Sequence, residues 1–317
     1  MKMLNLIFAI AILMTVGCAE TTTKPDSKSA TATAVLQVNY IAARTSNTLK
    51  VEDCPTGNTG WHKETLVEIS RKADACALFK KIERLEQIAN HIAKTFATEP
   101  WGAFYLSIAA EQRSDYARAL WMAELAIKKS PKNSILYYQR GRIHWLLNEV
   151  ALAISDYNES LKFNSKLADA HLILAQLAAR NQDYKSAVKH YQAVVEVETD
   201  NHKAFAALAE LFLKLNQVKD AIANYESAVN LSPRSIEYRL RLGAIYELNA
   251  KDYDQALSVY RKLKSMLAEN RTPSTDTVTN DVVEKIKKLE ALVAPAPKEE
   301  KKVTSAASAK KNAQVKK

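Results

Sequence analysis

The sequence predicts an all-α fold built from tandem helix hairpins. Only 6 of the 317 residues are glycine, which is too few for the many tight turns of a β-rich chain. Small residues also recur at intervals of 34 positions, at Gly141, Ala175, Ala209 and Gly243. A period of this length indicates a repeat architecture, in which each repeat buries its apolar face by stacking on its neighbours.

Two further positions follow the same period. One is a small residue and the other is an aromatic residue four positions later. A small side chain lets the two helices of a hairpin approach closely, while the aromatic ring is expected to fill the gap between one hairpin and the next. Proline at Pro131 and Pro233 ends a second helix. The two recurring sets are Ala119, Ala153, Ala187, Ala221 and Ala256, and Tyr157, Tyr191, Tyr225 and Tyr260, where the last member of each set is displaced by one inserted residue.

These positions resemble the pattern of the tetratricopeptide repeat, a 34-residue pair of antiparallel helices. The resemblance implies a solenoid of five hairpins within residues 100–270. The repeats are 100–133, 134–167, 168–201, 202–235 and 236–270.

The regions that flank the repeats are less regular. Within residues 35–99, apolar side chains at helical spacing predict one amphipathic helix over 74–96, either packed on the first repeat or half of a degenerate extra repeat. A second amphipathic helix is expected over 271–293, where it caps the apolar edge of the last hairpin. The tail 294–317 is rich in Pro, Ala and Lys, and its composition predicts disorder.

The N-terminus has the pattern of an export signal. Lys2 precedes an apolar run over residues 4–16, which is too short to span a bilayer as a helix. The alternative is a short buried helix. The run ends in Gly17-Cys18 and resembles a bacterial lipoprotein signal, which implies a signal peptide over 1–17 and lipidation of Cys18. Residues 18–34 are rich in Ser, Thr, Ala and Lys and are expected to form a flexible tether.

With Cys18 assigned to lipid, two cysteines remain. An exported protein meets an oxidising compartment, so Cys54 and Cys76 are expected to form one disulfide. Two free buried thiols are the alternative.

The sequence carries no sign of enzymatic chemistry. The six histidines form no HExxH pair, and neither a Gly-rich phosphate loop nor a GxSxG motif is present. We therefore expect no catalytic activity, no metal and no cofactor. The net charge is +10, and the tail 295–317 supplies +5 of it through seven lysines and two glutamates. The remaining chain is only mildly basic, which argues against nucleic acid as a partner.

The tetratricopeptide resemblance also implies a concave groove lined by the first helix of each hairpin. Positions two, five, nine, twelve and thirteen of a repeat share one helical face. Aromatic residues and Arg are favoured binding anchors, and they gather in the first two repeats. For Trp101 and Phe104, the alternative is packing beneath the preceding helix. The predicted partner-binding set is Trp101, Phe104, Ile108, Tyr138, Arg142, Trp145, Leu172, Gln176, Arg180, Lys203 and Glu210.

Taken together, the resemblances imply a protein-binding scaffold anchored through Cys18 at the periplasmic face of the outer membrane. The layout is similar to that of type IV pilus pilotin lipoproteins, which implies a role in assembling or positioning an envelope complex of the secretin or pilus type. The expected partners are envelope proteins and the lipid bilayer. The alternatives are a cell-wall-associated factor, whose Lys-rich tail contacts anionic polymers, and an adaptor for a periplasmic protease.

Overall fold

The computed structural model describes residues 49–57, 61–269 and 273–293. Every regular element in these ranges is helical, which confirms the predicted all-α class. The chain divides into two compact units, which meet in sequence between Ala170 and His171. The predicted signal peptide, tether and basic tail lie outside the described residues. No helix within the described ranges has the length and apolar character needed to cross a membrane.

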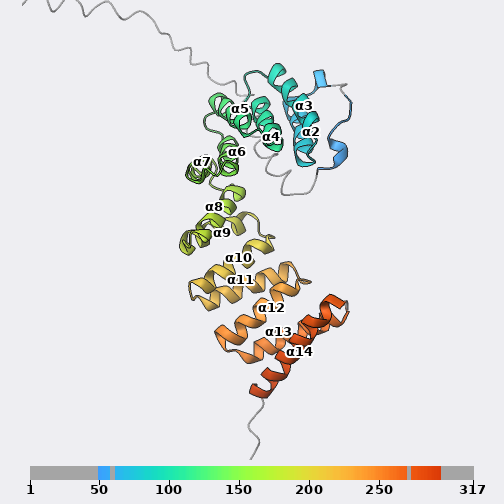
Figure 1. Ribbon diagram of the computed structural model, residues 1–317, viewed down its shortest axis with the longest axis vertical. Helices are drawn as coiled ribbons and strands as arrows, with labels where there is room; N and C mark the ends of the chain where they lie inside the picture. Colours follow the sequence, from blue (N-terminus) through green and yellow to red (C-terminus); the bar gives the residue numbers. More distant parts are fainter. Residues whose placement is uncertain (1–48, 58–60, 270–272, 294–317) are drawn as a thin grey trace, which may run out of the picture. The chain divides into compact units, whose positions relative to one another are not determined.

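Unit 1 is a stack of three helix hairpins (Figure 1). Two short 3-10 turns, η1 (Val51–Asp53) and η2 (Trp61–Lys63), precede it. Each helix packs on the next one in sequence, from α2 to α7. The hairpins are α2 (Leu66–Leu78) with α3 (Ile82–Thr95), α4 (Trp101–Gln112) with α5 (Tyr116–Lys129), and α6 (Ser134–Leu146) with α7 (Val150–Phe163).

The hairpin of α2 and α3 corrects the prediction of a single helix over 74–96. The chain turns between Leu78 and Ile82, where Lys80 adopts a left-handed conformation with φ 53°. Leu78 and Ile82 are four residues apart, so the apolar spacing of a helix continues across the turn. No glycine or proline marks the break, and the local apolar spacing alone therefore does not reveal it.

This left-handed residue recurs with the period of the repeat. It closes the turn between the two helices of each hairpin, and its φ lies between 53° and 63° throughout. Lys80 is in phase with the others, so α2 and α3 form an additional repeat over 66–99, ahead of the five that were predicted. The left-handed residues are Lys80, Ser114, Asn148, Gln182 and Asn216, each 34 positions after the last, followed by Lys251 after 35.

Unit 2 continues with hairpins and ends in a long helix (Figure 1). Most of α8 belongs to this unit. Its elements are α8 (Ala168–Arg180), α9 (Tyr184–Val197), α10 (His202–Lys214), α11 (Val218–Leu231), α12 (Ile236–Ala244), η3 (Ile245–Ala250), α13 (Tyr253–Glu269) and α14 (Pro273–Val293).

The residue inserted in the last repeat is absorbed by a short π-helix. Gly243 precedes the insertion and stays in register, whereas Ala256 follows it and is displaced by one position. Between them, η3 has π-helical geometry, which holds more residues per turn than an α-helix. The turn that follows still places Lys251 in the left-handed conformation, so the hairpin is preserved.

Burial confirms the register of the repeats. All five alanines of the second small set, from Ala119 to Ala256, are fully buried. A Cβ added to Gly141 would lie 3.0 Å from Cε1 of Tyr157, and one added to Gly243 would lie 2.6 Å from Cε1 of Tyr260. The recurring tyrosine therefore packs directly on the small residue of its own hairpin, which is why both positions are constrained together.

Helix α14 lies where the capping helix was predicted. It packs along α13, and its apolar side chains Val282, Ile286 and Leu289 are buried there. The last hairpin of unit 2 thus has its apolar edge covered, as a solenoid end requires.

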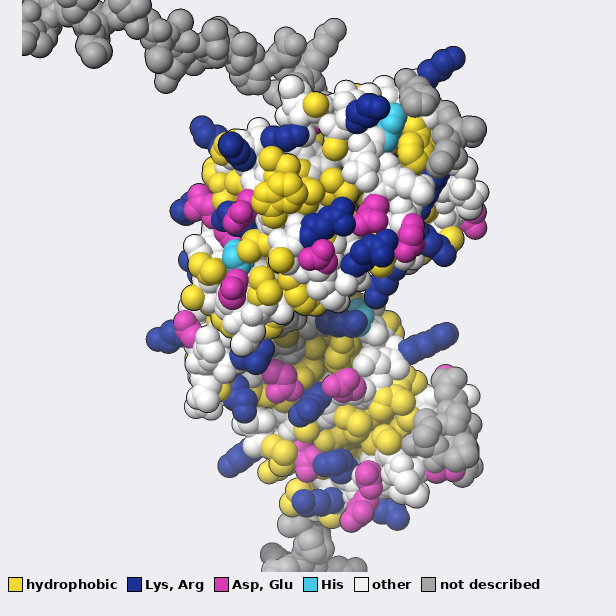
Figure 2. All heavy atoms as spheres, turned by 45° about the horizontal axis from the view of Figure 1, so that its top comes forward, with side chains coloured by type: hydrophobic (Ala, Val, Ile, Leu, Met, Phe, Trp, Pro, Cys, Tyr) yellow, Lys and Arg dark blue, Asp and Glu magenta, His cyan; other side chains and the backbone are white. Residues whose placement is uncertain are grey.

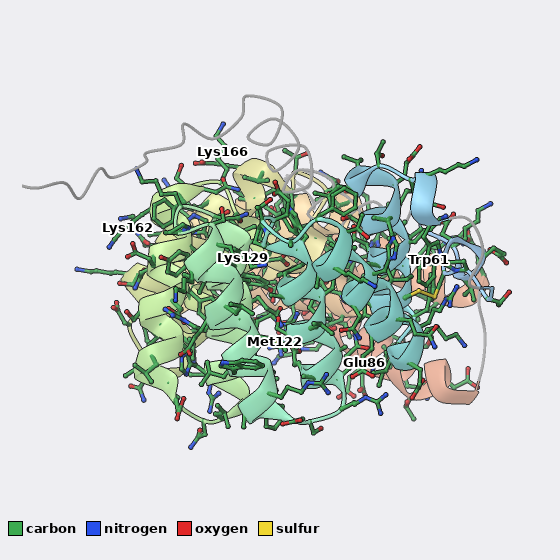
Figure 3. The ribbon with its side chains drawn as sticks, turned by 90° about the horizontal axis from the view of Figure 1, so that it is seen from above. Trp61, Glu86, Met122, Lys129, Lys162 and Lys166 are labelled. Atoms are coloured by element: carbon green, nitrogen blue, oxygen red, sulfur yellow. A yellow bond between two sulfur atoms is a disulfide. The ribbon has the colours of Figure 1, made fainter. Side chains whose placement is uncertain are left out.

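The segment before α2 is fastened to unit 1. Cys54 and Cys76 form a disulfide across 22 residues of sequence, visible as the yellow bond near Trp61 in Figure 3. Arg84 on α3 donates from Nε to the carbonyl oxygen of Pro55 over 2.6 Å, and its guanidinium lies 4.4 Å from the centre of the Trp61 ring. These contacts hold Cys54, Pro55 and Trp61 against the α2–α3 hairpin.

Candidate functional site

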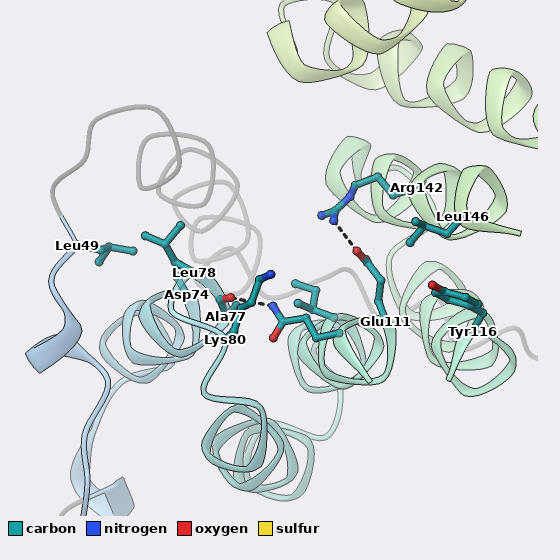
Figure 4. Close-up of a pocket in the computed structure, with 11 residues that line it drawn as sticks. Leu49, Asp74, Ala77, Leu78, Lys80, Glu111, Tyr116, Arg142 and Leu146 are labelled. Carbon is teal, nitrogen blue, oxygen red and sulfur yellow. Dashed lines mark hydrogen bonds and ion pairs between the residues drawn. The ribbon is translucent and has the colours of Figure 1, made fainter. Parts of the chain in front are cut away.

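Unit 1 contains a hollow of about 410 Å³ on the face formed by the first helices of its hairpins (Figure 4). Helices α2, α4 and α6 supply most of its lining, with α4 in contact with both of the others. This is the concave face on which the sequence placed a groove. The lining residues are Leu49, Asp74, Ala77, Leu78, Lys80, Ile108, Glu111, Gln112, Tyr116, Arg142 and Leu146.

Two leucines form exposed apolar walls of the hollow. Leu78 ends α2 and Leu146 ends α6, and each has 45% of its surface exposed. Figure 4 shows them on opposite sides of α4. Ile108 of α4 is buried in the floor, and Leu49 is buried in the wall beside Leu78. Exposed apolar side chains on opposite sides of a hollow can be buried when a ligand places an apolar side chain between them.

Two charged side chains of the lining are paired with each other. Arg142 forms an ion pair with Glu111 (Figure 4), and the other oxygen of Glu111 accepts a hydrogen bond of 2.7 Å from Nε2 of Gln139. Asp74 accepts a hydrogen bond of 2.8 Å from the hydroxyl of Tyr105. The sequence analysis named Arg142 as a binding anchor. The structure corrects this role, because Glu111 on the neighbouring first helix already neutralises the guanidinium.

Gln112 presents a buried acceptor in the lining. Its Nε2 donates to the carbonyl oxygen of Ala77 over 2.7 Å. Its Oε1 is buried and has no hydrogen-bond partner among the described residues. A buried acceptor without a donor costs free energy, so an N–H group brought by a ligand would be stabilised there.

Three aromatic residues of the predicted groove belong to the core instead. Trp101 and Phe104 are almost fully buried, and their rings meet edge to face with centroids 5.4 Å apart. Tyr138 is 4% exposed and packs on Tyr157. The reason is the additional hairpin: α3 lies against α4 and covers the face that would be open if the array began at residue 100. The packing alternative for Trp101 and Phe104 is therefore the correct one.

Of the predicted set, Ile108 and Arg142 line the hollow. Trp145 is half-buried on α6. Sequence reasoning missed the lining residues of the additional hairpin, among them Asp74, Leu78 and Lys80. One signal could have revealed this hairpin. Buried Ala73 lies 34 positions before Ser107, which itself lies 34 positions before Gly141, so Ala73 continues the recurring set of small residues.

The predicted groove residues of unit 2 are mostly exposed. Gln176, Arg180 and Lys203 are exposed, and Leu172 is half-buried. Glu210 accepts a hydrogen bond of 2.5 Å from the hydroxyl of Tyr225. Burial, together with this hydrogen bond, raises the pKa of Tyr225 well above its ordinary value, so the hydroxyl stays neutral.

The titratable groups do not form a catalytic arrangement that we can identify in the described ranges. One close pair is His171 and His190 in unit 2, whose Nδ1 atoms are 2.9 Å apart. Burial and the neighbouring His171 lower the pKa of His190. Within the described residues, no group of three or more His, Cys, Asp or Glu side chains is arranged to hold a metal.

Comparisons with known proteins agree with the repeat geometry. Residues 106–168 match the family model of the tetratricopeptide repeat. Residues 168–266 match a model described as the TT21 fifth ARM repeats domain. Among solved structures, the C-terminal part of a TPR repeat-containing protein from Cytophaga hutchinsonii is 16% identical, with a TM-score of 0.54 over 70% of this chain and 95% of that one. At that identity, the similarity concerns the fold alone.

Curated relatives share only part of their length with this chain. Hsp70-Hsp90 organizing protein 1 of Glycine max is 29% identical over 168 residues, which cover 48% of this chain and 29% of that protein. Tetratricopeptide repeat protein 37 of Xenopus laevis is 35% identical over 102 residues, or 32% of this chain and 6% of that protein. The chain thus spans less than a third of the length of these two relatives. Together with the helix hairpins and their 34-residue period, the match over residues 106–168 shows that the chain contains repeats of the tetratricopeptide type.

Proposed function

We propose that this protein is a non-enzymatic scaffold that binds a segment of a partner protein in the hollow of unit 1. The observation that carries the proposal is the pair of leucines, Leu78 and Leu146, held 45% exposed on opposite sides of a concave surface. Burying a leucine side chain is worth about 1.5–3 kcal/mol. A protein segment that covers both leucines gains affinity without any change in the floor beneath them.

The electrostatics of the floor favour a segment of low charge. Glu111 is 8% exposed and already satisfied by Arg142 and Gln139. A charged ligand that bound Arg142 or Glu111 would compete with that ion pair, and removing one partner of a buried ion pair is costly. The bound segment should therefore contribute mainly apolar side chains.

Leu146→Asp is expected to abolish partner binding while leaving the fold intact. The substitution puts a charge against the apolar wall, where a bound segment would have to desolvate it. Because Leu146 is an exposed position at the end of α6, we expect a change in stability of no more than about 0.5 kcal/mol. The measurement is affinity capture after mild crosslinking, with a thermal melt of each variant.

Leu152→Asp is the matched control for this experiment. Leu152 is 52% exposed on α7 and is not part of the hollow's lining, so this variant should capture the same protein as the wild type. Equal capture by the wild type and Leu146→Asp would contradict the proposed site. Loss of capture in both variants would point to a general effect of the added charge.

We further propose that the scaffold acts in the bacterial envelope, held at the periplasmic face of the outer membrane through lipid on Cys18. There it would position a component of a secretin-type or pilus-type complex. The support is the lipoprotein-like end of the apolar run at Gly17-Cys18. The disulfide between Cys54 and Cys76 is consistent with an oxidising compartment.

Cys18→Ser is expected to release the protein from membranes or to leave it unprocessed. Two or three acyl chains hold a protein firmly, because each buried methylene contributes about 0.8 kcal/mol. The check is membrane fractionation followed by a high-salt wash, with Cys54→Ser as the control for loss of a cysteine elsewhere. A Cys18→Ser protein that stays with the washed membranes would rule out this anchor.

A further inference from the structure

We propose that residues 35–48 of this same chain occupy the hollow of unit 1, and that a partner must displace them in order to bind. The inference rests on the proposed function of the hollow and adds a regulatory step to it. Three features support it: where the segment joins the structure, what it is made of, and what the hollow lacks.

The segment joins the structure at the hollow itself. Leu49, the residue that follows it, is only 8% exposed and forms part of the hollow's wall beside Leu78 (Figure 4). The chain immediately after Leu49 is held in place, since the backbone N–H of Lys50 donates to Oδ2 of Asp53 over 2.7 Å and Cys54 is joined to Cys76 on α2. Residues 35–48 are therefore joined to the described structure at Leu49, in the wall of the hollow.

The hollow is within reach of a segment of this length, because the segment is joined to its wall at Leu49. Fourteen extended residues reach up to roughly 45 Å, and a segment tethered this closely has an effective concentration in the millimolar range. At that concentration even a weak contact is largely formed, whereas a separate ligand at micromolar concentration would need a far higher affinity to compete.

The composition of the segment matches the hollow. Its first nine residues are Val-Leu-Gln-Val-Asn-Tyr-Ile-Ala-Ala, and Arg44 is the one charged residue in 35–48. The preceding stretch, 19–34, has four charged side chains and no apolar residue larger than alanine and proline. An apolar, nearly uncharged stretch thus begins where the predicted tether ends and leads to the hollow, whose exposed walls are Leu78 and Leu146 and whose floor holds the ion pair of Arg142 and Glu111.

The hollow also lacks a donor that the segment can provide. Oε1 of Gln112 is buried without a hydrogen-bond partner among the described residues. Gln37 and Asn39 carry side-chain amide N–H groups, and every residue from 35 to 48 has a backbone N–H. Occupation of the hollow would therefore cover Leu78 and Leu146 and satisfy a buried acceptor in one step.

Binding in the hollow would be regulated as a consequence. If the segment leaves the hollow open for only a fraction of the time, the apparent affinity for a partner falls by that fraction. A partner with a closely matching apolar segment displaces 35–48, while weaker apolar peptides are excluded.

Hydrogen exchange on the intact, processed chain tests the proposal without a partner. We expect amides of residues 35–48 to exchange at least ten-fold more slowly than the rate for an unstructured peptide. Leu146→Asp and Leu78→Asp should each restore fast exchange in 35–48. Leu152→Asp, on α7 and outside the lining, should leave the protection unchanged.

Three outcomes would overturn the proposal. They are fast exchange of 35–48 in the wild type, protection that survives both hollow substitutions, and protection that increases with protein concentration, which would indicate a second copy as the occupant. The outcome for the proposed function is separate. If partner capture depends on Leu146 while 35–48 exchanges freely, the hollow is still the binding site and only the occupation by residues 35–48 is wrong.

Discussion

Gly102→Ala is expected to destabilise unit 1 by about 2 kcal/mol or more, although alanine is the better helix former. In an exposed helix the same change stabilises by about 1 kcal/mol. Here a Cβ would lie 2.5 Å from Cα and 2.6 Å from N of Ala93 on α3. No rotamer change can relieve a contact with backbone, so α3 and α4 would have to move apart, and overpacking of this kind costs about 1–3 kcal/mol. Urea unfolding with a probe in unit 1 measures the loss.

Gly141→Ala is the matched control within the same unit. Its Cβ would lie 3.0 Å from Cε1 of Tyr157, and a side chain can adjust where backbone cannot. We expect a smaller loss of stability than for Gly102→Ala. If Gly102→Ala were neutral or stabilising, the close approach of α3 to α4, and with it the additional hairpin, would be wrong.

Trp101→Ala is expected to reduce the stability of unit 1 by about 3–5 kcal/mol, the usual cost of removing a fully buried large aromatic side chain. Trp101 has no exposed surface and packs against Phe104 and Tyr105. For a unit of this size, such a loss corresponds to a fall in Tm of roughly 10 °C. The measurement is a thermal melt followed by circular dichroism.

Trp121→Ala removes the same side chain from an exposed position. Trp121 on α5 is 61% exposed, so we expect a change within about 0.5 kcal/mol. Equal melting temperatures for the two tryptophan variants would contradict the assignment of Trp101 to the core. Equal melting temperatures would make Trp101 a candidate groove residue again.

The sequence was sufficient to predict the repeat register, and the reason is packing. Positions where two helices approach closely tolerate only small residues, so Ala187 and Ala221 recur at a fixed interval and are fully buried. The inserted residue was also visible, as the displacement of Ala256 and Tyr260. Its structural form, the π-helix η3, could not be predicted, because an extra residue can equally lengthen a turn.

The limits of the hollow could not be predicted, because they depend on contacts between repeats. Buried Leu85 lies 34 positions before Ala119, where the recurring set would require alanine. This larger residue obscured the additional repeat. An array that begins at residue 100 would leave Trp101 and Phe104 facing an open groove. Arg142 and Glu111 are 31 residues apart and belong to two different repeats. No local sequence pattern predicts that they form an ion pair.

Site-specific photocrosslinking tests the central claim, that unit 1 binds its partner in the hollow, most directly. A photoreactive residue is placed at 78 or 146 in the hollow, at 152 on α7, or at the exposed positions 176 and 203 of unit 2. We predict that positions 78 and 146 yield the same crosslinked partner protein and that the other positions do not. A partner crosslinked from 176 and 203 but not from 78 and 146 would contradict the account and place the binding surface in unit 2.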